Sequence, residues 1–184
     1  MRRTLDFNGI DRLSKHTLSD VFSTTYTAVE PFVSYLNEYC AKYEINTPLR
    51  LAAFLAQIGH ESGRLCFVEE IASGTAYEGR KDLGNIHPGD GVRYKGRGLI
   101  QITGRSNYVQ LSKALKLPFV EHPEWLSLPE YAVMTACWFW HNRGLNELAD
   151  AGRFRDITRI INGGYNGLED RGKLYEKCKR IFNI

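Results

Sequence analysis

The residue whose setting most suggests chemistry is Glu61, which follows a long uncharged stretch. Residues 51–59 carry no charge, and at 100° per residue Leu51, Phe54 and Ile58 share one helical stripe with Glu61 at its edge. Partial burial beside such a helix raises the pKa of a carboxyl group, because a low-dielectric setting disfavours the anion. A glutamic acid that keeps its proton near neutral pH can protonate a glycosidic oxygen, so the pattern indicates general acid catalysis.

A glycosidase of this kind needs a second carboxylate, and the downstream candidates are Glu69, Glu70 and Glu78. Inverting enzymes hold their two carboxyl groups roughly 6.5 to 9.5 Å apart, which leaves room for a water, whereas retaining enzymes hold them about 5 Å apart. Spacing along the chain does not choose among the three candidates. Adjacent acids such as Glu69 and Glu70 are also common on solvated surfaces. The residues alone therefore leave the base open.

Other catalytic arrangements fail on spacing. A zinc protease helix needs H-E-x-x-H, but no second histidine follows His60 and Glu61 at that distance. A serine hydrolase elbow needs G-x-S-x-G, whereas residues 59–63 contain one residue too many before Ser62. The glycines that flank Arg97 lack the further glycine and the lysine of a phosphate-binding loop. We therefore expect neither a metal ion nor an organic cofactor.

Composition and charge exclude further classes. The net charge of +3 is too small for a nucleic-acid footprint, and no stretch reaches the roughly 18 to 20 apolar residues of a membrane span. Residues 1–3 are basic, but no apolar core of signal-peptide length follows, so we expect synthesis in the cytoplasm without an export signal. The length of 184 residues favours a single domain. Four widely spaced cysteines form no C-x-x-C pair and are expected to be buried reduced thiols: Cys40, Cys66, Cys137 and Cys178.

The elements that would position Glu61 are mainly helices. Apolar residues at spacings of three and four predict an amphipathic helix over residues 31–43. Thr47 followed by Pro48 is typical of a helix start and leads into residues 49–60, with Gly63 as a stop. An uncharged run after Pro129 predicts a second buried helix. Helical patterns are predicted over these further ranges: from Ser106 to the residue before Pro118, 131–140, 153–161 and 168–182.

Residues 77–108 differ from these helices, since they hold seven of the seventeen glycines and show little helical periodicity. Within this loop-rich stretch, residues 99–103 predict a short strand. Alternation would put Gln101 and Thr103 on a face that can meet a ligand, with Ile100 and Ile102 on the core face. The tryptophans of the second uncharged helix, Trp138 and Trp140, are expected in the core and not as sugar-stacking platforms.

Four stretches together resemble glycoside hydrolase family 19, and within it the short phage endolysins and prophage lysozyme-like members. They are AFLAQIGHES at 53–62, YKGRGLIQITGRSNY at 94–108, ACWFW at 136–140 and IINGG at 160–164. The resemblance implies a mainly α fold of the α+β lysozyme-like type, in which two helical lobes flank a cleft with a small irregular β region. It also implies one catalytic domain over residues 1–184, with no separate binding module.

The resemblance implies roles for individual residues. Glu61 becomes the general acid, Thr103 helps to hold the attacking water, and the short endolysin spacing makes Glu70 the base. Glu78 is a rival base, because the plant chitinases place theirs farther downstream. The remaining positions implied to contact the sugar or to support the acid and base are His60, Glu78, Tyr94, Arg97, Gln101, Asn107, Asn162 and Arg171.

The activity implied is inverting hydrolysis of β-1,4 bonds in peptidoglycan by a muramidase-type endolysin, which would reach the cell wall through a holin-type pore and lyse the host. The net charge of +3 suits an anionic wall. The chain also lacks the disulfide framework and several loop insertions of the plant chitinases. Alternatives are a chitinase acting on N-acetylglucosamine polymers, a lytic transglycosylase and a catalytically silent glycan-binding protein. We expect a monomer that binds peptidoglycan strands or chitin oligosaccharides, without nucleic acid or membrane insertion.

Overall fold

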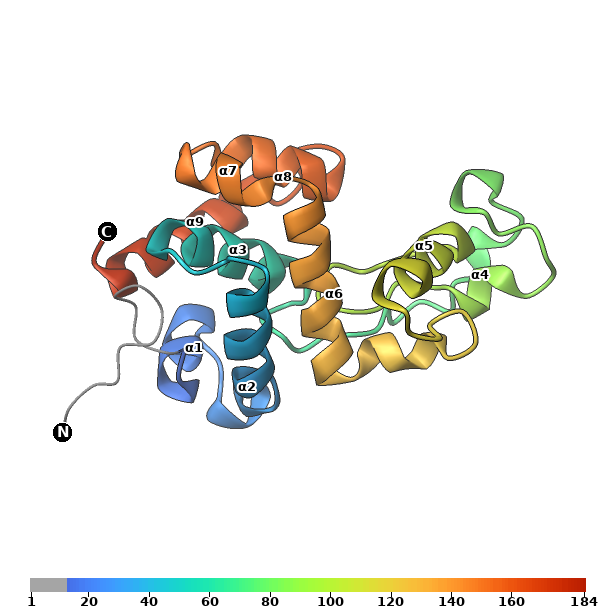
Figure 1. Cartoon of the computed structure of the whole chain (residues 1–184), viewed down its shortest axis with the longest axis horizontal. Coiled ribbons are helices and arrows are strands. Elements are labelled where there is room, and N and C mark those ends of the chain that lie inside the picture. The colour runs from blue at the N-terminus through green and yellow to red at the C-terminus, as the bar shows by residue number, and fades with distance from the viewer. Residues whose placement is uncertain (1–12) are drawn as a thin grey trace.

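The computed structural model describes residues 13–184 (Figure 1). The basic residues 1–3 and those after them, which carry the expectation about an export signal, lie outside the described residues. The described chain is mainly helical and contains no strand longer than an isolated bridge. None of these helices is both long and apolar enough to cross a bilayer. The predicted fold class is confirmed.

The larger of two lobes surrounds the main hydrophobic core. Helix α3 lies inside this lobe: its residues 51–59 are all buried, and it packs along α9. Figure 1 shows these helices gathered at one end of the molecule. They are α1 (Lys15–Phe22), α2 (Tyr26–Lys42), α3 (Pro48–Glu61), α6 (Pro129–Asn142), α7 (Leu145–Asp150), α8 (Phe154–Asn162) and α9 (Leu168–Phe182).

The smaller lobe has a core of its own, built from Tyr94, Ile102, Tyr108, Leu111, Phe119 and Leu126. Helix α6 lies between the two lobes (Figure 1). Its Trp140 belongs to the main core, and its Trp138 packs against the smaller one. The short elements of this lobe are η1 (Thr75–Tyr77), η2 (Lys81–Leu83), α4 (Asp90–Arg93), α5 (Arg105–Leu115) and η3 (Pro123–Ser127).

Helix α3 starts as its sequence predicts. The Thr47 side chain accepts a hydrogen bond from Arg50 N at 3.3 Å, and Pro48 occupies the first position, where its missing N–H costs nothing. Helix α2 differs from the prediction, because it begins at Tyr26 after a Thr25 cap and contains Pro31 within it. A proline there removes one helical hydrogen bond, and burial of the apolar face of α2 offsets that loss.

The strand predicted over residues 99–103 is wrong. Gln101 has a φ of +54°, and the chain turns back so that Arg97 forms isolated bridges with Glu69 and Ile102. The paired backbone bonds between Arg97 and Ile102 close a tight turn that also contains Gly98, at a φ of +79°. Too few residues remain to form a ladder, so the β region is reduced to these bridges.

Three of the four cysteines are buried and one is exposed. Cys40, Cys137 and Cys178 are buried and free, as expected, and burial raises the pKa of the Cys178 thiol to about 12. Cys66 is also free but exposed, contrary to the expectation. It follows directly after the turn that ends α3, where the chain leaves the core.

Candidate active site

A groove of about 670 Å³ lies between the lobes. Its walls come from the turn at residues 100–103 and α5 on the smaller lobe, and from α6 and the end of α8 on the larger lobe. Four of the side chains that the resemblance assigned to substrate line it, namely Gln101, Thr103, Asn107 and Asn162. The groove is therefore the place where both lobes can contact one ligand.

Glu61 is the last residue of α3, and its side chain is 18% exposed. Its Oε1 accepts a hydrogen bond from Arg171 Nη2 at 2.5 Å, and the Arg171 side chain is only 1% exposed. The sequence suggested a lone carboxyl group above an apolar helix. The structure instead gives it a buried guanidinium partner, which fixes one carboxylate oxygen.

Arg171 is itself anchored on two further sides. Its Nη1 donates to Gln57 Oε1 at 2.7 Å, and its Nε donates to Asn166 O at 3.2 Å. Asn166 N in turn donates to Asn162 Oδ1 at 3.2 Å, and Asn162 lines the groove. Through this chain of contacts Glu61, which is not itself among the groove-lining residues, is connected to the groove.

Sequence reasoning missed Gln57 and the residue behind it. Gln57 Nε2 donates to Thr158 Oγ1 at 2.8 Å, and Thr158 Oγ1 donates to Phe154 O at 3.2 Å. An uncharged residue in an apolar helix looks like core. The available signal was its spacing of four residues from Glu61, which puts both side chains on the same helical face.

His60 pairs with Asp170 beside the acid. His60 Nδ1 lies 2.6 Å from Asp170 Oδ2, and Arg64 donates to both carboxylate oxygens at 3.0 and 2.6 Å. The Arg64 hydrogen bonds, helped by His60 and opposed by burial, lower the pKa of Asp170 to about 2. Asp170 is therefore an anion near neutral pH, and it ties α9 to the end of α3.

A strained turn follows Glu61. Gly63, Arg64 and Leu65 have φ values of +55°, +64° and +67°, a left-handed conformation that costs energy for residues with a side chain. Burial of Leu65 and the pairing of Arg64 with Asp170 hold it. The turn redirects the chain so that Glu70 N donates to Gly96 O at 2.9 Å.

The Glu70 carboxylate has polar partners but no ion-pair partner within residues 13–184. Its Oε1 accepts from the Tyr77 hydroxyl at 2.9 Å and its Oε2 from Gly96 N at 3.1 Å. Burial and the neighbouring Glu70 raise the pKa of Tyr77, so its hydroxyl remains a donor. Lys95 Nζ reaches only the backbone oxygen of Glu70, at 3.1 Å.

Three predicted site residues converge at Gly96. A Cβ atom at that position would lie 2.8 Å from Gln101 Oε1, 3.2 Å from Glu70 Oε2 and 3.3 Å from Thr103 Oγ1. A side chain there would fill the space that these polar atoms share, so glycine keeps it open. Two of the three, Gln101 and Thr103, line the groove, and they connect Glu70 to it.

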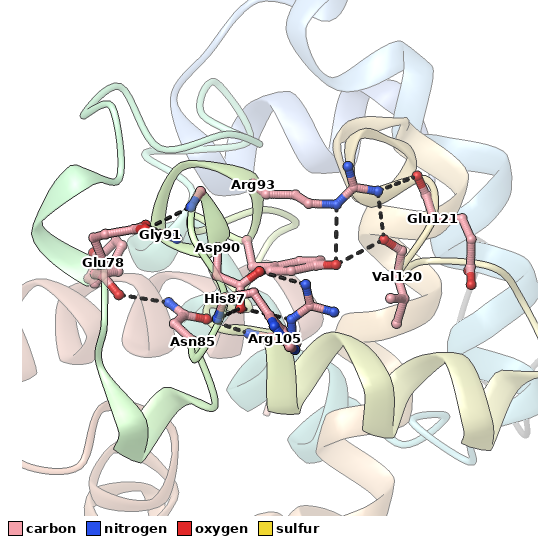
Figure 2. Close-up of polar contacts among 12 residues, drawn as sticks. Glu78, Asn85, His87, Asp90, Gly91, Arg93, Arg105, Val120 and Glu121 are labelled. Atoms are coloured by element: carbon pink, nitrogen blue, oxygen red, sulfur yellow. Dashed lines mark hydrogen bonds and ion pairs between the residues drawn. The ribbon is translucent and has the colours of Figure 1, made fainter.

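The other two acids have different partners. Glu69 Oε1 pairs with Lys95 and Arg97 at 3.1 and 3.2 Å. Burial raises the pKa of Glu69, but these two cations outweigh it and the net shift is downward. Glu78 accepts backbone N–H bonds with both oxygens, from Gly89 at 2.7 Å and from Gly91 at 2.8 Å; Figure 2 shows the bond from Gly91. Among the three candidate bases, Glu70 is the one that shares the space at Gly96 with Gln101 and Thr103; it accepts one backbone N–H, whereas Glu78 accepts two.

Two residues that the resemblance placed in the cleft do not line the groove. Tyr94 is 1% exposed and donates to Val120 O at 3.1 Å, and Arg97 is buried behind Glu69. Both support the smaller lobe, because they fill space under the turn that carries Gln101. Trp138 was expected in the core but lines the groove. Trp140 is buried, as predicted.

A second polar cluster lies on the smaller lobe around Asp90 (Figure 2). Its side chain is 2% exposed and accepts from Arg105 Nε and Nη2 at 2.8 and 2.6 Å and from His87 N at 3.0 Å. The Arg105 hydrogen bonds, opposed by burial, lower the pKa of Asp90 to about 2. The guanidinium of Arg105 lies 4.8 Å from the Tyr94 ring centre. No motif in the sequence pointed to this cluster.

Within residues 13–184, no group of three or more histidine, cysteine, aspartate or glutamate side chains is arranged to hold a metal ion.

The chain is similar to known proteins in both sequence and fold. The family model of glycoside hydrolase family 19, described as chitinase class I, matches residues 22–149. A glycosyl hydrolase family 19 domain-containing protein of Haemophilus influenzae is 34% identical over 158 residues, which cover 69% of this chain and 77% of that protein. An endochitinase of Arabidopsis thaliana is 41% identical over 138 residues, which cover 74% of this chain and 45% of the relative.

Solved structures share the fold. A bacterial family 19 chitinase superposes with a TM-score of 0.74 over 93% of this chain and 95% of the other, at 22% identity. The chain thus spans less than half the length of the Arabidopsis endochitinase but nearly all of this bacterial structure.

Proposed function

The chain belongs to glycoside hydrolase family 19, and from that premise we propose that it hydrolyses β-1,4 bonds between N-acetylglucosamine units of chitin-type polymers, with inversion at the anomeric carbon. The observation that carries the proposal is the convergence of Glu70, Gln101 and Thr103 on one point beside the groove. A carboxylate, an amide and a hydroxyl together are what a site needs to hold a sugar and a nucleophilic water.

Glu61 is the proposed general acid. Arg171 holds Oε1, whereas Oε2 receives no hydrogen bond from any residue of the described part of the chain. That free oxygen can carry the proton that the leaving glycosidic oxygen needs. Because the side chain is partly exposed at the end of a rigid helix, its position is set before the substrate binds.

Glu70 is the proposed base, and Thr103 the residue that orients the water. Thr103 Oγ1 already donates its hydrogen to Gln101 O at 2.9 Å, so it offers lone pairs to a water. A water that donates one hydrogen to Thr103 can donate the other to Glu70. As its oxygen attacks the anomeric carbon, the proton passes to the Glu70 carboxylate, and Glu61 protonates the departing oxygen.

The groove offers amide groups for an N-acetylated sugar. Gln101, Asn107 and Asn162 line it together with the apolar side chains of Ile100 and Trp138. Amides can exchange hydrogen bonds with the acetamido group and the hydroxyls of the sugar, while the apolar side chains cover its less polar face.

Chitin is preferred as the substrate because relatives in Arabidopsis thaliana and Pisum sativum are endochitinases. Peptidoglycan cleavage by an endolysin, delivered through a separate pore, is the second candidate, and the net charge of +3 favours it for an anionic wall. Digestion of both polymers by the purified chain, with mass spectrometry of the fragments, separates the two. Anhydro-sugar ends would instead identify a lytic transglycosylase.

The mechanism is tested by NMR of the first products from a chitin oligosaccharide. We expect the α-anomer to form before mutarotation, because a single displacement inverts the β-linkage. Release of the β-anomer would overturn inversion. Full turnover by Glu61→Gln would overturn the acid assignment, and a chain that binds the polymer but releases no reducing ends would be a glycan-binding protein.

A further inference from the structure

Behind the acid lies a buried polar chain of Thr158, Gln57 and Arg171, of which only Arg171 was expected from the sequence. Gln57 and Thr158 are both 0% exposed and come from different helices, α3 and α8, while Arg171 comes from α9. Three helices of the larger lobe therefore meet at one side chain, the amide of Gln57, which contacts the guanidinium that holds Glu61.

The direction of every hydrogen bond in this chain is determined. Thr158 Oγ1 donates to Phe154 O, so it can only accept from Gln57 Nε2. The amide of Gln57 is then oriented with Oε1 toward Arg171 Nη1. The reversed amide would place an NH₂ group against a guanidinium N–H, and a buried pair of donors is costly.

We propose that Gln57 and Thr158 are positioning residues for catalysis, which fix the plane of the Arg171 guanidinium and through it the direction in which the Glu61 carboxylate faces. This inference rests on the proposed function. Neither residue touches Glu61, so their effect must pass through Arg171. Displacement of a catalytic group by about 1 Å can cost on the order of 10²-fold in rate, which makes such support measurable.

Thr158→Val is the sharpest test, because valine keeps the shape of threonine and removes the hydroxyl. Thr135→Val is a matched control: Thr135 is also 0% exposed in a helix and donates to the carbonyl four residues before it, at 2.8 Å, but no side chain bonds to it. We expect Thr158→Val to lower kcat by about three- to tenfold with KM unchanged, and Thr135→Val to leave kcat at the parent level.

Thr158→Ser supplies the rescue, since it restores the hydroxyl without the methyl group. We expect it to recover most of the lost kcat. Thermal melts of the three variants serve as the stability control. A role in packing alone predicts that kcat is lost only as the variant approaches its Tm, whereas positioning predicts that Thr158→Val has a lowered kcat at temperatures well below its Tm, where it is fully folded.

Gln57→Glu tests the same inference with an added charge. A carboxylate at Arg171 Nη1 competes with Glu61 for the guanidinium, and its negative charge disfavours ionisation of Glu61. The other charged groups beside the acid, His60, Arg64 and Asp170, pair with one another and are unchanged. We expect kcat to fall by at least about tenfold, and the alkaline limb of the kcat/KM profile to move to higher pH.

The outcomes separate this inference from the proposed function. Loss of activity in Glu61→Gln, with Thr158→Val identical to Thr135→Val in kcat and Gln57→Glu unchanged in pH profile, would overturn the positioning role and leave the proposed function intact. Full activity in Glu61→Gln would remove the proposed function itself.

Discussion

Two arginine–carboxylate pairs, one on each lobe, differ in which partner is buried. In the larger lobe the Arg171 side chain is 1% exposed and Glu61 is 18% exposed. In the smaller lobe the order is reversed, because Asp90 is 2% exposed and Arg105 is 27% exposed. The same kind of ion pair therefore presents its carboxyl group to solvent at one place and its guanidinium at the other.

In the described part of the chain, only one of the two carboxylates has an oxygen that is free to react. Both oxygens of Asp90 are used, by Arg105 and by the backbone N–H of His87, so this carboxylate organises the loop around it. Glu61 has one fixed oxygen and one without a partner in the described chain. A carboxylate that is anchored on one side and open on the other can transfer a proton without losing its position.

The largest effect on turnover is expected when the carboxyl group of each pair is replaced in turn by the corresponding amide. Glu61→Gln should reduce turnover on a chitin oligosaccharide by at least about 10²-fold, because the transferable proton is lost, and it should also lower the melting temperature, because the buried Arg171 loses its anionic partner. Asp90→Asn, measured under conditions where it is folded, should keep turnover within about threefold. Equal losses in both variants would contradict the contrast between the pairs.

A second matched pair of variants tests which glutamate is the base. Glu70→Gln should reduce turnover by about 10²-fold, since it removes the proton acceptor beside Thr103. Glu78→Gln should instead lower stability, because Glu78 accepts the backbone N–H groups of Gly89 and Gly91. Steady-state kinetics and thermal melts check both; loss of turnover only in the Glu78 variant would move the base there.

Breaking the pair between Asp90 and Arg105 is expected to lower stability. Asp90→Asn should lower the free energy of unfolding by about 2 to 3 kcal/mol, because the charged hydrogen bonds to Arg105 are lost in a buried setting. Arg105 is partly exposed and can reach water, which keeps the loss below that of a fully buried pair. Urea unfolding of the parent and the variant measures it, and an unchanged midpoint would show that the pair contributes little.

The smallest effect is a change in acid sensitivity. The pKa of Asp90 falls from its usual 3.8 to about 2 in the folded chain, so its contribution to stability is complete above pH 4 and is lost as the pH falls toward 2. Asp170, whose pKa is also about 2, contributes in the same window. The stability of Asp90→Asn should therefore depend less steeply on pH between 4 and 2 than that of the parent, as followed by acid titration of the fold.

Much of the fold could be predicted from local pattern. The uncharged runs became α3 and α6, the Thr47 cap and Pro48 marked a helix start, and residues 168–182 became α9. The short helices α1 and α7 were not predicted, because a few turns carry too little periodicity. The strand failed because two apolar residues that alternate with polar ones, Ile100 and Ile102, fit equally well in a turn that contains Gly98.

The site was predicted less completely. The resemblance pointed to Gln101, Thr103, Asn107 and Asn162, which line the groove. It also pointed to Tyr94 and Arg97, which are buried under it. A motif records that a residue belongs to a site but not whether it faces the ligand or supports the residues that do.

The sequence alone was enough to predict the longer helices, to place Glu61 at the end of a buried helix, and to recognise the motifs of the family. These depend on periodicity and caps within a few turns of chain. The partner of Glu61 depends on the tertiary structure. Arg171, which binds Glu61, is 110 residues away along the chain, and Gln57, which binds Arg171, is 114 residues from Arg171. Such contacts exist because α9 packs against α3, and the pairing of distant side chains depends on that packing, which no local pattern encodes.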